Sequence, residues 1–425
     1  KKFNRNEKIE RHILTKYWNK NNDLIQQRIN TVKQDIGPIA DVFQFLNNQH
    51  ISPVTSNNKV QLLTNGEEKF KHLFNDLKHA KHHIHVEYYI FKDDSIGNQF
   101  IDILIEQRKK GVQIRVILDD FGSSTKKIKK RLLENDIEFH LFLPVTFNSL
   151  ANSNYRDHRK IVIIDGEIGY VGGINVADKY INTANSDLYW RDTALKINGN
   201  ATSILQLYFW NNWNLDDSKT NYLNEAYFPM GDLFTKENDE EKQLTDISFT
   251  FSNPGYDSPY AMDSIILAIY KATKSIKICT PYFIPSEQLN TALETAAMRG
   301  VSVEIILPKN SDSKIVQLAS ISFTKPLLKK GVQIYLYNKG FLHAKTILID
   351  DVMSFIGTIN LDTRSFYLNF EIAAIVADRE LGKQMAKQFE LDKKNSDLLT
   401  LHKYLKKGKL YRSAASICRL LSPVL

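Results

Sequence analysis

Segments with the spacing of strands alternate with segments with the spacing of helices along most of the chain. After a helical pattern that includes Ile25, Ile29, Val32 and Ile36, HHIHVEYYIF reads as a strand and GNQFIDILIEQRKKG as a helix. VQIRVILDD then reads as a second strand, and KKIKKRLLENDI as a second helix. This order predicts an α/β fold with a parallel or mixed sheet and crossover helices.

The same pattern starts again in the second part of the chain. DSIILAIYKATKSIKICTPYFIP matches EKFKHLFNDLKHAKHHIHVEYYIFKD, and LNTALETAAMRGVSVEIILPKN matches FIDILIEQRKKGVQIRVILDD. Matches of this length indicate duplication of a whole domain. The polar, acidic residues 216–246 between the copies predict a linker. We therefore expect two α/β domains, each a mixed sheet flanked by helices, packed face to face with a site between them.

Each copy contains one stretch in which polar residues interrupt an aliphatic run. HRKIVIID at 158–165 and HAKTILID at 343–350 share a His, a Lys two positions later and an Asp five positions after the Lys, and a Gly and an Asn recur downstream. The recurring positions are His158, Lys160, Asp165, Gly172 and Asn175 in the first copy and His343, Lys345, Asp350, Gly357 and Asn360 in the second. Alternate residues of a strand face the same side, so each His should point with its Lys, and a Gly lets backbone approach a ligand. Folding does not require repeated His, Lys, Asp and Asn, whose burial is costly unless they are paired, so the recurrence favours a functional site over a polar strand edge.

These residue types fit a phosphodiester better than a metal ion. A fixed Lys ammonium would repel a divalent cation, whereas it suits a phosphate oxyanion. One imidazole can attack phosphorus, while the other protonates the leaving alcohol and then deprotonates the incoming one. The Lys and Asn side chains would stabilise charge on the nonbridging oxygens. The pattern therefore predicts phosphodiester chemistry at a pseudo-twofold interface, with no metal and no cofactor.

Composition narrows the partners without choosing among them. The net charge of +8 and the pI near 9.0 favour anionic partners, namely nucleic acid, phospholipid headgroups or phosphorylated small molecules. Only two cysteines, Cys279 and Cys418, occur, which excludes a cysteine-rich zinc or disulfide framework. The sequence contains no run of 18 or more apolar residues, so it predicts no membrane-spanning helix. Because the sequence begins KKFNRNEK, without Met, we expect a fragment or processed form, and an upstream anchor stays open.

The double H-x-K-x4-D motif, followed each time by G-G/T-x-N, resembles the phospholipase D superfamily. DHRKIVIIDGEIGYVGGIN, YWRDTALKINGNA, TPYFIPSE and RLLSPVL extend the resemblance to the bacterial cardiolipin synthases, from about residue 50 to 425. The resemblance implies that a phosphatidyl group passes from one phosphatidylglycerol to the enzyme, as a phosphohistidine, and then to a second phosphatidylglycerol. The products would be cardiolipin and glycerol.

The resemblance also implies roles for individual residues. His158 would be the nucleophile and His343 the general acid, and Asp192 and Glu371 would orient the imidazoles. The motif places two further carboxylates in the catalytic set, although their five-residue offset from the Lys predicts that they anchor the end of a strand. These are Asp165 and Asp350. We interpret Asn175 and Asn360 as phosphate-binding residues.

The predicted organisation has five parts. They are a basic helical segment at 1–50, a first phospholipase D-like domain at 51–215, the linker at 216–246, a second such domain at 247–400 and a basic amphipathic tail at 401–425. The expected partners are phosphatidylglycerol and an anionic membrane surface, without nucleic acid. The expected location is the bacterial cell membrane, reached through upstream helices absent from this chain or through the basic segments. Alternatives are a phospholipase D or phosphatidylserine synthase of the same fold, a nuclease or other phosphodiesterase, and a basic binding module with an inactive site; residues alone do not choose the acceptor.

Overall fold

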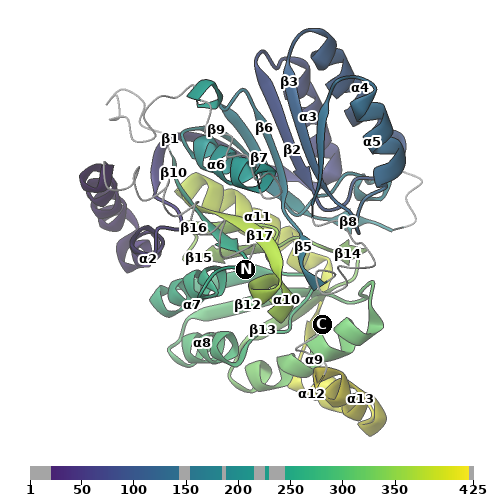
Figure 1. Ribbon diagram of the computed structural model, residues 1–425. Helices are drawn as coiled ribbons and strands as arrows, with labels where there is room; N and C mark the ends of the chain where they lie inside the picture. The colour runs from purple at the N-terminus through teal and green to yellow at the C-terminus, as the bar shows by residue number, and fades with distance from the viewer. Residues whose placement is uncertain (1–20, 143–153, 184–187, 215–224, 229–244, 421–425) are drawn as a thin grey trace.

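The computed structural model describes residues 21–142, 154–183, 188–214, 225–228 and 245–420. Within these ranges the chain forms two α/β halves that lie one above the other (Figure 1). Most of the linker predicted at 216–246, residues 1–20 of the basic segment and residues 421–425 of the tail lie outside the described residues.

The first half contains a mixed sheet with the strand order β1-β9-β7-β6-β2-β3-β4. Its strands are β1 (Thr55–Thr64), β2 (His83–Tyr88), β3 (Gln113–Asp119), β4 (Glu138–Phe142), β6 (Lys160–Ile164), β7 (Ile168–Gly172) and β9 (Thr193–Gly199). Its helices are α3 (Asn65–Lys78), α4 (Ser95–Lys109), α5 (Thr125–Leu133) and α6 (Ala201–Trp213). Strands β2, β3 and β4 are parallel, while β6, β7, β9 and β1 pair antiparallel. A crossover helix therefore connects each pair of consecutive parallel strands: α4 connects β2 to β3, and α5 connects β3 to β4.

The second half repeats this arrangement with the order β10-β17-β16-β15-β11-β12-β13-β18. Its strands are β10 (Thr245–Ser252), β11 (Ser275–Cys279), β12 (Ser302–Pro308), β13 (Gln333–Tyr337), β15 (Thr346–Ile349), β16 (Met353–Gly357), β17 (Asn369–Ala377) and β18 (Ser396–Leu399). Its helices are α7 (Tyr260–Lys271), α8 (Glu287–Met298), α9 (Lys314–Lys329), α10 (Thr363–Tyr367) and α11 (Arg379–Lys394). The matching order confirms the predicted α/β duplication.

The two sheets are joined edge to edge, which the sequence did not predict. Strand β1 pairs antiparallel with β10, so the hydrogen-bonded ladder runs from one half into the other. Strands β16 and β17 also contact β7 and β9, so the halves meet face to face as well. Each of β1 and β10 would otherwise be an edge strand with unpaired backbone groups, and their pairing removes both edges.

Local pattern explains the helices and the central strands. Phe70, Leu73, Phe74 and Leu77 recur at three- and four-residue intervals on α3, and all four are buried. Strand β6 lies between β2 and β7 and is buried along its whole length, so it reads as a continuous apolar run rather than an alternating one.

Helices at both ends pack on the second half. The helix over residues 21–36 buries Ile25, Ile29 and Val32, and it leads through a 3₁₀ turn (Gly37–Ala40) to α2 (Asp41–Asn48), which contacts α7. The last described helices are α12 (Leu401–Lys406) and α13 (Lys409–Leu420), and α13 packs along α9. Across the described ranges, we find no helix that combines the length and apolarity needed to cross a bilayer.

Candidate active site

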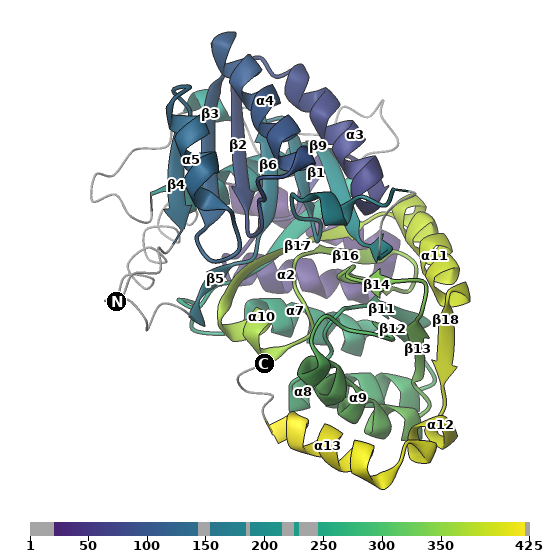
Figure 2. The ribbon, with the colours of Figure 1, turned by 90° about the vertical axis from the view of Figure 1, so that its right-hand side faces the viewer.

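Two short strands leave their own half and pair with the other half. Strand β5 (Arg156–Asp157) pairs parallel with β17 of the second half, and β14 (Phe341–Leu342) pairs parallel with β8 (Trp190–Arg191) of the first. The motif histidine follows each short strand: His158 N–H donates to Phe370 O at 2.9 Å, and His343 N–H donates to Arg191 O at 2.7 Å. This reciprocal pairing brings both motifs to the interface between the halves (Figure 2).

Each histidine is held by a carboxylate from the opposite half. Nδ1 of His158 lies 2.9 Å from Glu371 Oε2, and Nδ1 of His343 lies 2.7 Å from Asp192 Oδ2. Both carboxylates are fully buried. An ionised carboxylate can only accept a hydrogen bond, so Nδ1 carries the proton in both rings and a neutral ring leaves Nε2 unprotonated. The structure thus places Asp192 and Glu371 beside the imidazoles, and it pairs Asp192 with the histidine of the second motif.

The two motif lysines lie buried beside the rings. Lys345 Nζ donates to His343 O at 2.5 Å, and Lys160 Nζ donates to His158 O. Burial lowers the pKa of Lys160 to about 7 and the pKa of Lys345 to about 8. The charge of Lys345 also lowers the pKa of both Lys160 and His158, so the two motifs are close enough to repel one another. An anion between them would relieve this repulsion.

Burial and the lysines favour the neutral form of both imidazoles. Burial is the main reason that the pKa of His343 falls to about 4, and the Lys345 ammonium lowers it further. Burial also lowers the pKa of His158. For Asp192 and Glu371 burial alone would raise the pKa, but the facing histidine and the nearby lysine outweigh it and hold each pKa below its usual value. The site therefore presents two unprotonated Nε2 atoms and two ionised carboxylates near neutral pH.

The two asparagines are buried close to the motifs. Asn175 Oδ1 accepts from Ile90 N–H at 3.1 Å, and its amide nitrogen lies 3.4 Å from Tyr180 Oη. Asn360 Oδ1 is buried and has no hydrogen-bond partner among the described residues. The first amide is therefore fixed by the protein, whereas the second retains capacity for a ligand.

The motif aspartates lie at the far end of the strands from the histidines. Asp165 accepts from the backbone N–H groups of Lys81, His82 and His83, at 2.9, 2.7 and 3.0 Å. Asp350 accepts in the same way from residues 273–275. Both have positive φ, 55° and 53°, a conformation that Asp tolerates better than most residues. The structure brings neither to an imidazole, so this placement fits strand-end anchoring and not the catalytic role that the motif predicted.

The recurring glycines make room for protein rather than for a ligand. A Cβ on Gly172 would lie 2.5 Å from Ala194 Cα of β9, and one on Gly357 would lie 2.1 Å from Ile372 O of β17. A Cβ on Gly173 would lie 2.2 Å from Asp192 Oδ1. The expectation that the glycines bring backbone to a ligand is therefore wrong: they admit a neighbouring strand and the orienting carboxylate.

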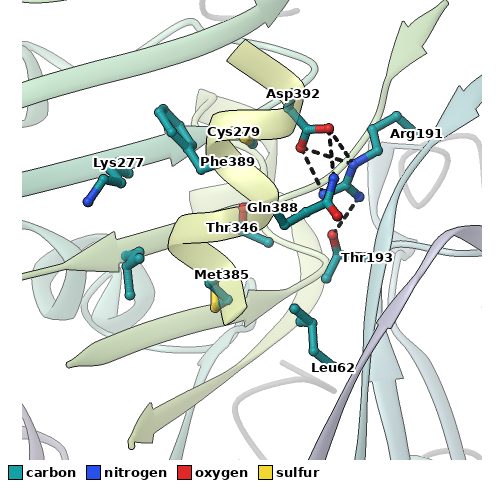
Figure 3. A pocket seen from close by; sticks show the side chains of 11 residues that line it. Leu62, Arg191, Thr193, Lys277, Cys279, Thr346, Met385, Gln388, Phe389 and Asp392 are labelled. Atoms are coloured by element: carbon teal, nitrogen blue, oxygen red, sulfur yellow. Dashed lines mark hydrogen bonds and ion pairs between the residues drawn. The ribbon is translucent and has the colours of Figure 1, made fainter. Parts of the chain in front are cut away.

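Sequence reasoning missed a buried ion pair behind Asp192. Arg191 Nη2 lies 2.9 Å from Asp392 Oδ2 of α11, and Arg191 Nε lies 2.9 Å from Asp392 Oδ1 (Figure 3). The same guanidinium donates to Asp192 O and, at 2.9 Å, to Thr193 Oγ1. It thus ties the backbone of the orienting carboxylate to a helix of the other half. The Arg in YWRD, next to Asp192, was the available signal, but its partner lies 201 positions away.

Aromatic rings flank both histidines and were also missed. The Tyr89 ring lies 5.0 Å from the His158 ring, and the Trp190 ring lies 5.1 Å from the His343 ring. One aromatic ring therefore packs against each imidazole. The repeat could not identify these two residues as part of the site, because Tyr89 and Trp190 do not occupy matching positions in the two copies.

Comparison with known proteins agrees with this geometry. The family model described as "Cardiolipin synthase, PLD-like domain" matches residues 73–213 and 265–393, one segment in each half. The chain is 38% identical over 389 residues to the major cardiolipin synthase ClsA of Bacillus subtilis, covering 90% of this chain and 79% of that protein. It is 36% identical over 406 residues to cardiolipin synthase 2 of Staphylococcus epidermidis, covering 95% and 82%.

A solved structure supports the fold independently. The crystal structure of phosphatidylserine synthase from Haemophilus influenzae superposes with a TM-score of 0.65 over 91% of this chain and 100% of that chain, at 16% identity. At this identity the likeness establishes the arrangement of the two halves and not the acceptor. Taken with the family match in both halves, the motifs and their crossed carboxylates place this chain in the cardiolipin synthase family of the phospholipase D superfamily.

Proposed function

We propose that the chain transfers a phosphatidyl group between two phosphatidylglycerol molecules through a phosphohistidine, releasing glycerol and forming cardiolipin. The observation that carries this proposal is the pair of crossed contacts, His158 with Glu371 and His343 with Asp192. They hold two imidazoles with free Nε2 atoms at one interface between two lysines. The relatives named cardiolipin synthase supply the substrate class.

The first step uses the two rings in different ways. His158 Nε2 attacks phosphorus, the bond from phosphorus to the headgroup glycerol oxygen breaks, and protonated His343 gives its proton to that oxygen. Burial lowers the pKa of His343 to about 4, so the ring must gain a proton when substrate binds. The negative phosphodiester raises the pKa of the ring that faces it, which supplies that proton at neutral pH. Lys160, Lys345 and Asn360 stabilise the phosphoryl oxygens.

The second step reverses the roles around the same phosphorus. His343 Nε2 accepts the proton of a glycerol hydroxyl from a second phosphatidylglycerol, whose oxygen attacks phosphorus while the bond to His158 breaks. The histidines are then ready for another turnover. Asp165 and Asp350 take no part and hold the strands that carry the lysines. The substrates lie in an anionic membrane, so the chain acts at the bacterial cell membrane surface.

The acceptor is decided by product analysis in water enriched in ¹⁸O with phosphatidylglycerol vesicles. Cardiolipin with one glycerol per molecule, free of the heavy isotope, is expected. Phosphatidic acid carrying the heavy oxygen as the main product would make the enzyme a phospholipase. Release of product only when serine or a nucleic acid is supplied would favour the corresponding alternative.

The pH dependence of kcat/KM should reflect the deprotonation of the two motif lysines. Because the pKa values of Lys160 and Lys345 are about 7 and about 8 in the folded protein, both amines lose charge as the pH rises through this range. Stabilisation of the phosphodiester is complete below these values and lost above them, so kcat/KM should decline on the alkaline side. Initial rates between about pH 6 and about pH 9 test this, since kcat/KM reports groups of the free enzyme.

A charge-preserving variant provides the control for this profile. Arginine stays protonated throughout the range, so the alkaline decline of Lys160→Arg should move to higher pH in whatever activity remains. A profile with the same alkaline limb in the wild type and in Lys160→Arg would assign the decline to another group.

A further inference from the structure

We infer that the rim of the active site between the start of α5 and the start of α9 is the surface that docks on an anionic phospholipid bilayer. The rim consists of Phe121, the exposed face of α5 (Lys126, Lys129, Lys130 and Leu133) and Ile315. The inference rests on the proposed function, because only a lipid substrate requires the site to meet a membrane. It adds which face of the molecule does so.

Phe121 connects this rim to the catalytic histidine. The ring is 72% exposed, among the most exposed large apolar side chains in the described ranges. Its backbone N–H donates to Asp119 Oδ1 at 2.9 Å, and Asp119 Oδ2 accepts from the N–H of Asp157, the residue before His158, at 3.0 Å. The Arg156 guanidinium lies 5.3 Å from the Phe121 ring. An exposed phenylalanine is therefore anchored to the strand that presents His158.

The matching loop of the second half offers a second apolar side chain. Residues 120–124 link β3 to α5, and residues 309–313 link β12 to α9 in the same place of the duplicated fold. Ile315, in the first turn of α9, is 47% exposed. Figure 2 shows α5 above β5 and α9 below β14, both on the near side of the molecule. The helices α5 and α9 therefore lie on opposite sides of the strands that carry the histidines, and each begins near an exposed apolar residue.

The exposed face of α5 supplies positive charge beside Phe121. The helix TKKIKKRLL has five basic residues and no acidic residue. Lys127 pairs with Asp93 at 3.0 Å and Arg131 with Asp102 at 2.6 Å, whereas Lys126 and Lys129 have no ion-pair partner among the described residues. Lys126, Lys129, Lys130 and Leu133 follow the i, i+3, i+4, i+7 spacing of one helix face, and all four are exposed. A basic face with apolar side chains at its ends is complementary to an anionic bilayer.

Acidic groups near the rim are already engaged. Asp312, in the second loop, accepts from Tyr282 Oη at 2.8 Å, and Glu134 lies 3.8 Å from Lys130. Asp93 is the partner of Lys127. Asp312 keeps its negative charge, because a tyrosine hydroxyl is neutral. The five basic residues of α5 nevertheless pair with only three carboxylates within the described ranges, Asp93, Asp102 and Glu134, so the exposed face of this helix carries a surplus of positive charge.

The test compares rim variants with matched variants elsewhere on the full chain. The rim variants are Lys126→Gln/Lys129→Gln/Lys130→Gln and Phe121→Ser. The charge control is Lys383→Gln/Lys387→Gln/Lys394→Gln, three exposed lysines of α11, which lies away from α5 in Figure 2. The apolar control is Met298→Ser, at the end of α8, where the side chain is 59% exposed. Cosedimentation with phosphatidylglycerol vesicles and with phosphatidylcholine vesicles measures binding.

The rim lysine variant should bind phosphatidylglycerol vesicles on the order of a hundredfold more weakly than the wild type. Phe121→Ser should bind about tenfold more weakly, and Phe121→Trp should keep the affinity. Both control variants should bind like the wild type. Every variant should keep wild-type turnover of a short-chain phosphatidylglycerol that stays monomeric in solution, because no rim residue contacts the reacting atoms.

Unchanged vesicle binding by both rim variants would overturn the inference. So would an equal loss in the α11 control, because binding would then follow total charge rather than this face. Sedimentation needs no turnover, so the docking face can be judged even if product analysis refutes the proposed transfer. A wild type that makes cardiolipin while its rim variants bind normally would leave the proposed function standing and remove the docking face alone.

Discussion

Replacing either motif histidine with glutamine is expected to abolish transfer while leaving the fold in place. Glutamine keeps an N–H donor for the buried Glu371 or Asp192 but cannot attack phosphorus or carry the transferred proton. The loss of general acid–base catalysis alone costs about 10²–10⁴-fold, and loss of the nucleophile removes the covalent route altogether. Alanine would leave a buried carboxylate unpaired, so glutamine separates chemistry from stability better.

The two variants should differ in one measurable respect. With phosphatidylglycerol labelled at phosphorus, His158→Gln should form no labelled enzyme, whereas His343→Gln should still form it slowly, because its nucleophile is intact. His402→Gln, at an exposed position of α12, serves as the control and should act like the wild type. Near-normal activity in either motif variant would refute the two-histidine mechanism. Labelling of His158→Gln but not of His343→Gln would exchange the assigned roles.

Asp392→Asn is expected to destabilise the protein by about 3–5 kcal/mol, the usual cost of leaving one partner of a buried ion pair uncompensated. Arg191 and Asp392 are both nearly inaccessible to solvent, with 4% of each side chain exposed. Their contact joins β8 of the first half to α11 of the second, so its loss weakens the interface as well as the site (Figure 3). The midpoint and slope of chemical unfolding measure the change.

A matched pair on the surface provides the control for Asp392→Asn. Lys309 and Asp397 are 2.8 Å apart, with side chains 49% and 47% exposed, so Asp397→Asn should leave the free energy of unfolding nearly unchanged, because water screens an exposed pair. The double variant Arg191→Met/Asp392→Leu should recover much of the stability, because it leaves no buried charge. It should not recover activity, since the backbone of Asp192 loses the guanidinium that holds it. Equal effects of the buried and the exposed substitution would contradict the proposed importance of the buried pair.

The sequence by itself determined the α/β class, the duplication and the identity of most site residues. These follow from local features: apolar spacing within each segment, and a polar motif that recurs where folding does not require it. His158, Lys160, His343 and Lys345 could be selected because each lies in a short stretch with a matching copy. The family match in both halves confirms that this repeat marks a cardiolipin synthase.

Only the tertiary structure decided which groups meet. His158 pairs with a carboxylate 213 positions away and His343 with one 151 positions away, and local spacing carries no information about such contacts. The edge-to-edge joint of β1 with β10 and the Arg191–Asp392 pair are long-range contacts of the same kind. For the glycines, the sequence shows that they recur in both copies, but it does not show why glycine is needed at these positions. Gly172 and Gly357 are required because the neighbouring strand of the same sheet passes too close for a Cβ, and only the folded chain shows how closely that strand approaches.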